Sequence, residues 1–237
     1  MDVQEATTCR LPDLKERHLP ENCRETINTI LKETYGYEQF RNLEIYDDLS
    51  KGKEKLCISQ GQLIENVILE VEKAWKGETQ VDNILLTAPT GSGKSLLFQL
   101  PAIYLGKEYN LLTIVVSPLK ALIVDQVESL QELGYMRVAY ASSDLSPEQK
   151  MEVYRQVREG EIDLFYLSPE LLLSYDIKHF VGERRIGLVV VDEAHTVTTW
   201  GKEFRVDYWF LGRYLTALKQ TLGYNFPLFA LTATAVW

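Results

Sequence analysis

Residues 86–96 read LTAPTGSGKSL, and no other stretch of the chain constrains its fold as strongly. Apolar residues lead into this stretch, but a proline and two glycines make it a poor continuation of a strand. Gly91 and Gly93 permit backbone angles that are closed to other residues, so that successive N–H groups can point toward one centre. We therefore expect a turn that surrounds a ligand, with a strand before it and a helix after it.

The residue types of this turn are those that a phosphate group requires. Ala88-x-x-x-x-Gly93-Lys94-Ser95 is the phosphate-binding pattern, with alanine in place of its first glycine. Lys94 would place a cation on the β and γ phosphates of ATP, and Ser95 would give Mg²⁺ a hydroxyl ligand. The residues predicted to contact the nucleotide here are Pro89, Thr90, Gly91, Ser92, Gly93, Lys94 and Ser95. A glycine-rich turn that binds nothing is the alternative.

The rest of the chain alternates between strand-like and helix-like segments. Short apolar runs predict strands at 83–87, 112–117, 137–140, 163–167, 187–191 and 227–232. Helical patterns separate them at 94–105, 120–133, 147–158 and 207–222. This alternation predicts an α/β fold in which helices cover both faces of a mostly parallel sheet, with ligands beyond the carboxyl ends of its strands.

An N-terminal helical segment is predicted over residues 1–80, ahead of a nucleotide-binding domain over 81–237. Residues 1–20 look like a loose lead-in, and helical spacing follows over 21–35, ended by Gly36. The charged run at 51–55, KGKEK, is interpreted as a solvated loop. A second amphipathic helix is expected over 62–75.

Composition excludes several classes of function. The formal net charge is −9 and the isoelectric point is about 5.0, so any nucleic-acid site has to be a local patch. The cysteines Cys9, Cys23 and Cys57 form no CxxC pair, which predicts reduced thiols and no structural zinc in this chain. No apolar run approaches the roughly 18 residues that span a bilayer, and no signal-peptide pattern opens the chain. We expect a cytoplasmic protein, or a nuclear one in a eukaryote, that has no membrane partner.

A second motif, LVVVDEAH at 188–195, supports the phosphate-binding interpretation. A buried strand delivers Asp192 and Glu193 at its carboxyl end, where an unpaired acidic pair would be costly. A nearby Mg²⁺ would remove that cost, with Asp192 holding the metal and Glu193 orienting and deprotonating the attacking water. His195 follows the two acids and would link the state of the nucleotide to another site. An acidic strand end that faces solvent is the alternative.

Several motifs together resemble the superfamily 2 helicases. APTGSGKS at 88–95, DEAH at 192–195 and LTATA at 231–235 look like motifs I, II and III of that superfamily. YGYEQFR at 35–41 and SPLKALIVDQV at 117–127 are similar to the nucleotide-recognition motif and motif Ia of its RecQ-like branch. QVREGEIDLFYLSPELL at 156–172 and TTWGKEFRVDY at 198–208 resemble further RecQ segments. The resemblance implies a RecA-like P-loop NTPase fold and an ATP-dependent DNA helicase.

The resemblance also implies which residues would recognise adenine. Tyr37 and Arg41 would enclose the base, and Gln62 would hydrogen-bond its edge. In RecQ proteins this glutamine lies three residues after the arginine, where this chain has Glu44. The match at Gln62 therefore requires an insertion between the arginine and the glutamine.

A further set of residues is implied in contacts with single-stranded or forked DNA. Trp200, Phe204 and Arg205 would lie in the loop that senses the strand, and aromatic rings stack on bases without sequence preference. Core packing is the alternative for the two aromatic residues. The other residues implied in backbone contact or coupling are Ser117, Pro118, Lys120, Ser142, Ser143, Thr232 and Thr234. For the serines, capping and turn roles are an equal alternative.

The resemblance extends from about residue 35 to Trp237, which lies just past LTATA. A helicase of this kind needs a second RecA-like lobe that completes the ATP site with arginines, supplied in cis or in trans. We expect this chain to be the first motor lobe, which alone would hydrolyse ATP weakly and would not unwind DNA. A nucleotide-dependent DNA-binding switch that does not translocate, or an RNA helicase, are the alternatives.

Overall fold

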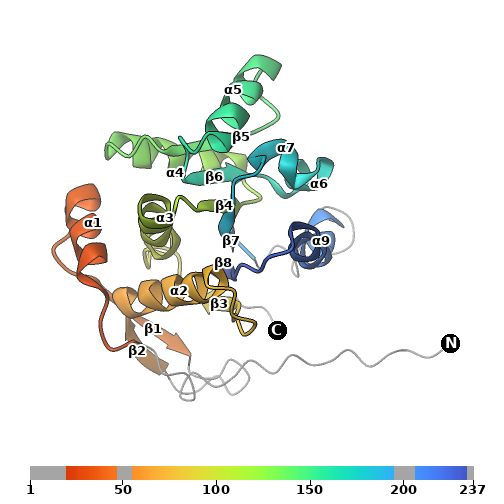
Figure 1. Cartoon of the computed structure of the whole chain (residues 1–237). Coiled ribbons are helices and arrows are strands. Elements are labelled where there is room, and N and C mark those ends of the chain that lie inside the picture. Colours follow the sequence, from red (N-terminus) through yellow and green to blue (C-terminus); the bar gives the residue numbers. More distant parts are fainter. Residues whose placement is uncertain (1–19, 47–54, 195–205, 234–237) are drawn as a thin grey trace.

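The computed structural model describes residues 20–46, 55–194 and 206–233. A six-stranded sheet forms the centre of this part, in the order β3-β8-β7-β4-β6-β5 (Figure 1). Every neighbouring pair of strands in it is parallel. The strands are β3 (Ile84–Thr87), β4 (Leu112–Val116), β5 (Val138–Ala141), β6 (Leu164–Leu167), β7 (Ile186–Val191) and β8 (Leu228–Thr232). The predicted parallel α/β fold is confirmed.

Strands β4, β6 and β7 are buried on both faces, which explains their nearly continuous apolar sequences. In β7, Leu188 and Val190 join the apolar cluster on one face, and Val189 and Val191 join the cluster on the other. The same alternation sends Tyr166 of β6 to the first cluster and Phe165 to the second. Strands β6 and β7 therefore contact both layers of helices.

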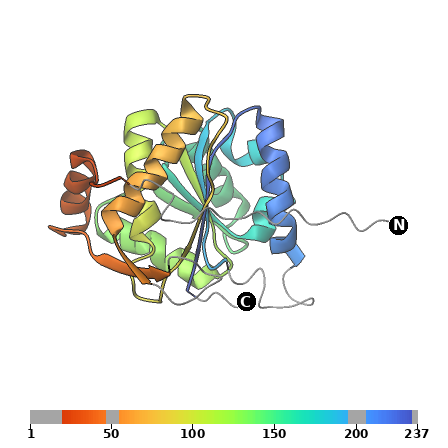
Figure 2. The ribbon, with the colours of Figure 1, turned by 90° about the horizontal axis from the view of Figure 1, so that it is seen from below.

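Helices cover the two faces of the sheet (Figure 2). On one face lie α2 (Gln60–Trp75), α3 (Leu96–Tyr109) and α4 (Lys120–Glu132). On the other face lie α5 (Pro147–Arg158), α6 (Pro169–Ser174), α7 (Ile177–Val181) and α9 (Val206–Leu222). The short helices α6 and α7 were not expected from the sequence, because neither is long enough to show a helical period.

The N-terminal segment packs against α3 and contacts α2. Helix α1 (Glu25–Tyr35) begins later than the expected position 21 and ends at Gly36, whose φ of 69° is left-handed. The Arg24 guanidinium before it donates to Glu65 at 2.6 Å and to Glu72 at 2.6 Å, both on α2. Ile27, Ile30 and Leu31 of α1 belong to the same buried cluster as α3. The division of the chain at residue 80 stays a prediction.

The charged region after α1 holds a hairpin that the sequence interpretation missed. Strands β1 (Asn42–Tyr46) and β2 (Lys55–Ser59) pair antiparallel, with Leu43 opposite Ile58. Both of these side chains are buried, and their burial stabilises the hairpin although the residues around them are polar. The prediction of a loop is wrong at Lys55, which opens β2, and residues 51–54 lie outside the described part.

Helix α2 begins two residues before its expected start, since Ser59 caps it. The Ser59 hydroxyl and the Gln62 side chain form a reciprocal capping box, which satisfies N–H groups at the helix start. None of the helices described is long and apolar enough to cross a membrane.

Candidate nucleotide-binding site

Three adjacent strands bring the predicted site residues to one edge of the sheet. The phosphate loop follows β3, Asp192 and Glu193 follow β7, and Thr232 ends β8 between them. Backbone hydrogen bonds join these segments directly. The Ala88 N–H donates to the Thr232 carbonyl at 3.0 Å, and the Ala194 N–H donates to the Leu231 carbonyl at 2.8 Å. The two acidic residues are therefore held in fixed relation to the phosphate loop.

The phosphate loop has the backbone that its glycines predict. Gly91 and Gly93 have φ values of 79° and 78°, a left-handed conformation that a side chain would strain. The Leu96 N–H donates to the Gly93 carbonyl at 3.2 Å, so helical turns begin within the loop itself. Pro89 and Thr90 are exposed with both glycines, and Ser92, Lys94 and Ser95 are half-buried. The loop is open to a ligand on its outer side.

Polar groups in this loop are placed for an anion. The Lys94 ammonium donates to the carbonyls of Ala88 and Pro89 at 2.9 and 3.1 Å, so it lies folded over the loop. The hydroxyl oxygen of Ser92 is buried and makes no hydrogen bond to any described residue. A phosphate group would offer Lys94 charged oxygens in place of neutral carbonyls, and the Ser92 hydroxyl would reach it only if the atoms that cover this oxygen moved. The residues present therefore fit a nucleotide phosphate.

Asp192 is a carboxylate with little access to water, because only 5% of the residue is exposed. Burial and the neighbouring Glu193 carboxylate raise the pKa of Asp192 to about 6, against smaller effects of the Glu193 N–H, Lys94 and Gln126. A bound cation would relieve the cost of that buried charge. The described residues hold no group of three or more His, Cys, Asp or Glu side chains placed to bind a metal ion. Asp192 with the Ser95 hydroxyl suits Mg²⁺, which binds through few protein oxygens and nucleotide phosphates.

Glu193 has a backbone conformation that costs energy. Its φ is 50°, one of two positive values among the described residues other than glycine. Such a conformation costs about 1–3 kcal/mol and persists where the surroundings impose it, commonly at functional sites. The Glu193 N–H donates to Asp192 Oδ1 at 2.9 Å, so the turn that strains Glu193 also orients Asp192.

The residues implied in adenine recognition lie on and after α1. Tyr37 is 50% exposed and its ring stacks on that of Tyr35, with centroids 6.3 Å apart. Arg41 is exposed at the start of the hairpin. Gln62 is the third residue of α2, and its side-chain oxygen accepts the Ser59 N–H at 3.0 Å. Their contacts with adenine stay predictions.

Gln60, which the sequence interpretation did not select, lies against the phosphate loop. It is 2% exposed; its side-chain oxygen accepts the Arg41 N–H at 3.1 Å, and its Nε2 donates to the Ser92 carbonyl at 3.1 Å. A Cβ atom at Gly93 would lie 2.7 Å from that Nε2. Gln60 therefore connects the predicted adenine segment to the loop. The capping box of Ser59 and Gln62 was the signal that could have placed Gln60 in the first turn of α2.

The residues implied in DNA contact are covered to different degrees. Ser117 is 1% exposed, and neither its hydroxyl nor that of Ser142 hydrogen-bonds a described residue. Lys120 opens α4 and pairs with Asp144, which ties the segment after β4 to the loop after β5. Ser143 is exposed and Pro118 is buried. Direct DNA contact by the Ser117 or Ser142 hydroxyl thus requires a change in the residues that cover it.

Five further predicted residues lie outside the described part: His195, Trp200, Phe204, Arg205 and Thr234. The roles implied for them stay predictions.

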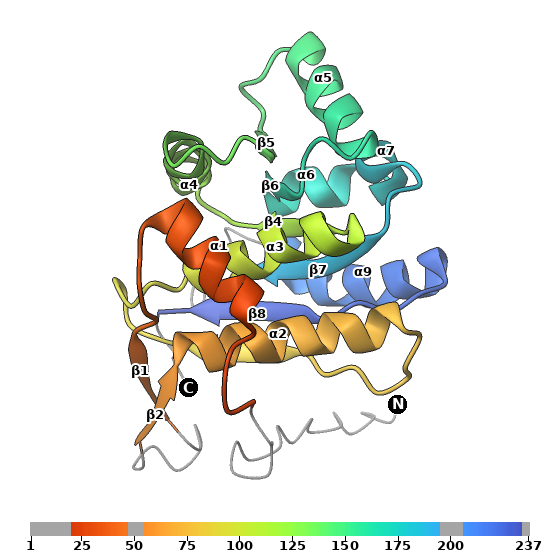
Figure 3. The ribbon, with the colours of Figure 1, turned by 60° about the vertical axis from the view of Figure 1, so that its left-hand side comes forward.

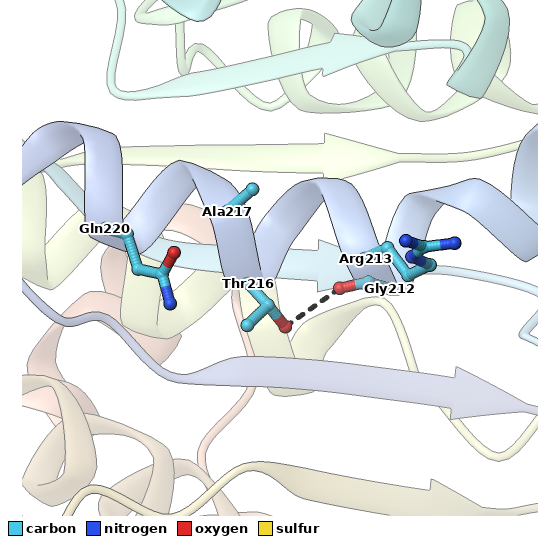
Figure 4. Close-up of a pocket in the computed structure, with 5 residues that line it drawn as sticks. All are labelled: Gly212, Arg213, Thr216, Ala217 and Gln220. Atoms are coloured by element: carbon cyan, nitrogen blue, oxygen red, sulfur yellow. Dashed lines mark hydrogen bonds between the residues drawn. The ribbon is translucent and has the colours of Figure 1, made fainter.

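A hollow on the outer side of α9 is separate from this site. Figure 4 shows its lining residues along that one helix, where the Thr216 hydroxyl donates to the Gly212 carbonyl at 3.0 Å. The lining residues are Gly212, Arg213, Thr216, Ala217 and Gln220. None of them is a predicted site residue, so the hollow contributes nothing to the nucleotide site.

Comparison with known families agrees with this geometry. The family model described as DEAD/DEAH box helicase matches residues 65–236. The chain belongs to the DEAD/DEAH box helicase family. The match includes the phosphate loop and the two acidic residues that the fold places at one edge of the sheet.

Curated relatives within the family are RecQ helicases, which confirms the resemblance noted in the sequence. The chain is 35% identical over 217 residues to the ATP-dependent DNA helicase RecQ of Synechocystis, covering 90% of this chain and 38% of the relative. It is 31% identical over 210 residues to the ATP-dependent DNA helicase RecQ of Haemophilus influenzae, covering 89% and 28%. The chain thus spans roughly a third of the length of these relatives.

Solved structures confirm the fold of the helicase motor. The structure titled as the DUF1998 helicase MrfA bound to DNA matches 93% of this chain and 28% of its own, with a TM-score of 0.58 and 22% identity. The UvsW helicase from bacteriophage T4 matches 94% of this chain and 64% of its own, with a TM-score of 0.51 and 16% identity. These likenesses extend to the fold alone.

Proposed function

We propose that this chain is the ATP-binding lobe of a RecQ-like DNA helicase, which couples hydrolysis of Mg-ATP to movement along single-stranded DNA and to unwinding. One observation carries the proposal: the phosphate loop with Lys94 and the acidic pair with Asp192 follow strands that β8 alone separates, and backbone hydrogen bonds of 3.0 and 2.8 Å tie both segments to β8. The family match and the RecQ relatives, at 31–35% identity, support the choice of helicase chemistry.

The residues divide the chemistry among them. Lys94 and the N–H groups of the loop bind phosphate oxygens. Ser95 and Asp192 hold Mg²⁺, which when bound supplies positive charge to the phosphates. Glu193 accepts a proton from the attacking water. Tyr37, Arg41 and Gln62 select adenine.

Movement along DNA would require both a DNA-contacting segment of this lobe and a second RecA-like lobe. The segment at 198–208 would contact single-stranded DNA and stimulate hydrolysis when a strand is bound. A second RecA-like lobe, in the same polypeptide or a partner, would close over the nucleotide with its arginines. The isolated lobe is then a weak ATPase.

Glu193→Gln in the natural protein tests this assignment. The amide has the size of the carboxylate but accepts no proton from water, so ATP binding should persist while hydrolysis falls at least about a hundredfold. Hydrolysis is measured as phosphate release with and without single-stranded DNA. The exposed Glu170→Gln is the matched control and should hydrolyse ATP as the wild type does.

Turnover at the wild-type rate in Glu193→Gln would contradict the assignment of the base. Stimulation by a uridine homopolymer but not by a thymidine homopolymer would favour an RNA helicase. A nucleotide-dependent change in DNA affinity without any unwinding by the natural protein would favour a switch.

A further inference from the structure

Behind the nucleotide site, a series of hydrogen-bonded polar side chains runs from α1 toward Asp192, and its two middle members, Gln99 and Tyr166, are buried. Its first member is Tyr35, the last residue of α1, which lies across α3 (Figure 3). The Tyr35 hydroxyl donates to the side-chain oxygen of Gln99 on α3 at 2.9 Å. Gln99 donates in turn from its Nε2 to the Tyr166 hydroxyl on β6 at 3.2 Å.

The hydrogen-bonded series continues toward Asp192, the predicted metal ligand. The Tyr166 hydroxyl donates to the side-chain oxygen of Gln126 on α4 at 3.0 Å. The Gln126 side chain faces the Asp192 carboxylate and lowers its pKa, and only the Gln126 amide N–H groups can donate to it, because a carboxylate has no proton to give. Each of the three hydrogen bonds therefore has its donor on the side of Tyr35 and its acceptor on the side of Gln126. A directed series that ends beside a negative charge is strengthened by that charge.

Burial makes the arrangement costly to disturb. Tyr166 is fully buried and Gln99 is 5% exposed, so a polar atom that lost its partner there would find no water. Burial raises the pKa of both Tyr35 and Tyr166, and Asp192 raises that of Tyr166 further. Both hydroxyls thus stay protonated and remain donors.

The two ends of this hydrogen-bonded series lie beside the two parts of the predicted site, the adenine-binding segment and the metal ligand. At one end the Tyr35 ring stacks on Tyr37, the residue implied in contact with adenine. At the other end the Gln126 side chain faces Asp192, whose carboxylate accepts the Glu193 N–H at 2.9 Å. Residues that orient a metal ligand from behind commonly matter for metal affinity by about 10- to 100-fold.

We propose that Gln126, held by Tyr166 and Gln99, is a positioning residue for the Asp192 carboxylate. The hydrogen-bonded series from Tyr35 to Gln126 then fixes this metal ligand relative to the adenine-binding segment. The inference rests on the proposed Mg-ATP site. It assigns a role to side chains of α3, β6 and α4 that contact neither nucleotide nor metal.

Metal-dependent nucleotide binding tests the inference in this chain. Gln126→Leu keeps the approximate size of the side chain and removes its amide. Tyr166→Phe keeps the aromatic ring and removes its hydroxyl. The probe is a fluorescent ATP analogue, whose affinity is measured by fluorescence, first in EDTA and then with Mn²⁺. The affinity for Mn²⁺ itself is measured by electron paramagnetic resonance. We expect about tenfold weaker Mn²⁺ binding in both variants, and nucleotide affinity in EDTA within about twofold of the wild type.

Matched controls separate positioning from packing. Gln131→Leu changes an exposed glutamine of the same helix, and Tyr154→Phe changes a buried tyrosine of α5 that takes no part in the hydrogen-bonded series. Both should bind Mn²⁺ as the wild type does. Tyr35→Phe removes the first donor at the far end and should weaken Mn²⁺ binding by about two- to threefold, since the effect passes through more links.

Mn²⁺ affinities of the Gln126 and Tyr166 variants equal to those of their controls would overturn the positioning role. An equal loss of nucleotide affinity in EDTA would also overturn it, because the defect would then lie in packing and not in the metal ligand. If Gln126→Leu fails to fold, Tyr166→Phe and Tyr35→Phe decide. A wild-type chain that binds the analogue in EDTA and gains nothing from Mn²⁺ overturns this inference but not nucleotide binding, and one that binds no analogue overturns both.

Discussion

At the residue scale, Asp192 combines a functional position with a cost to stability. The fold holds its carboxylate away from water next to Glu193, and its pKa of about 6 in the folded chain lies above the ordinary 3.8. A carboxyl with a raised pKa favours the fold in its protonated form, so its contribution is present at pH below about 4 and is lost as pH rises through about 6. Without a metal ion, the ionised group destabilises the chain at neutral pH.

Asp192→Asn should therefore raise the stability of the metal-free chain. The expected gain at about pH 7.5 is at most about 3 kcal/mol, and it should shrink toward zero as pH falls to about 4. Urea unfolding at several pH values measures it. The exposed Asp125→Asn is the control, with a change within about 0.5 kcal/mol at every pH. A gain that does not depend on pH would mean that the charge of Asp192 is not the cause.

Single residues of the site were predictable where a motif fixes their chemistry. The loop, with Lys94 and the pair Asp192 and Glu193, follows from residue types that phosphate and metal require at a strand end. Gln60 was missed because its role depends on its contacts with Ser92 and Arg41, which lie far from it in sequence.

At the scale of the element, α3 carries the phosphate loop at one end and a tightly packed glycine at the other. A Cβ atom at Gly106 would lie 2.2 Å from Cγ of Asp163. Asp163 is fully buried and cannot move aside, since it pairs with Arg137 at 2.6 Å and with Arg184 at 3.0 Å. This close approach fixes α3 against the sheet.

Gly106→Ala should destabilise the chain by about 2–4 kcal/mol, although alanine is the better helix former. Gly212→Ala on α9 is the matched control, because a Cβ atom there meets nothing within 4 Å. That variant should gain up to about 1 kcal/mol from helix propensity alone. Thermal unfolding compares the two, and equal effects would refute close packing at Gly106.

Elements with a long pattern were predictable, and elements fixed by contacts were not. Helix α5 has the predicted bounds, since Ser146 caps it, Pro147 opens it and its apolar spacing is regular. The β1–β2 hairpin was missed because few buried residues, such as Leu43 and Ile58, hold it among charged ones. Helix α6 carries a capping signal at Ser168 and Pro169 that could have revealed it.

At the scale of the whole molecule, parallel topology gathers motifs from distant parts of the sequence. The strand order puts β8 between β3 and β7, so the segment after each strand reaches the same edge. The α/β class was predictable from alternation, but the strand order was not, because register and order depend on contacts between strands. The chain spans 28–38% of the two RecQ relatives.

Trp200→Ala in the natural protein should abolish stimulation of hydrolysis by single-stranded DNA while ATP binding stays intact. The reason is that a ring stacked on a base contributes about 1–3 kcal/mol, which alanine cannot replace. Phosphate release with increasing lengths of single-stranded DNA measures it. The control is Trp75→Ala on α2, a tryptophan on the part of α2 remote from the phosphate loop. Unchanged stimulation in Trp200→Ala would contradict the motor function.

The proposed function depends above all on binding of the ATP phosphates by the loop at residues 88–95 through Lys94. Calorimetric titration of ATP with Mg²⁺ into the wild-type chain, Lys94→Ala and the exposed Lys107→Ala tests it directly. We expect binding in the wild type and in Lys107→Ala, and an affinity at least about tenfold lower in Lys94→Ala, because a charged hydrogen bond to phosphate is worth roughly 1.5–3 kcal/mol. Equal affinity in all three proteins would contradict it and place the nucleotide elsewhere.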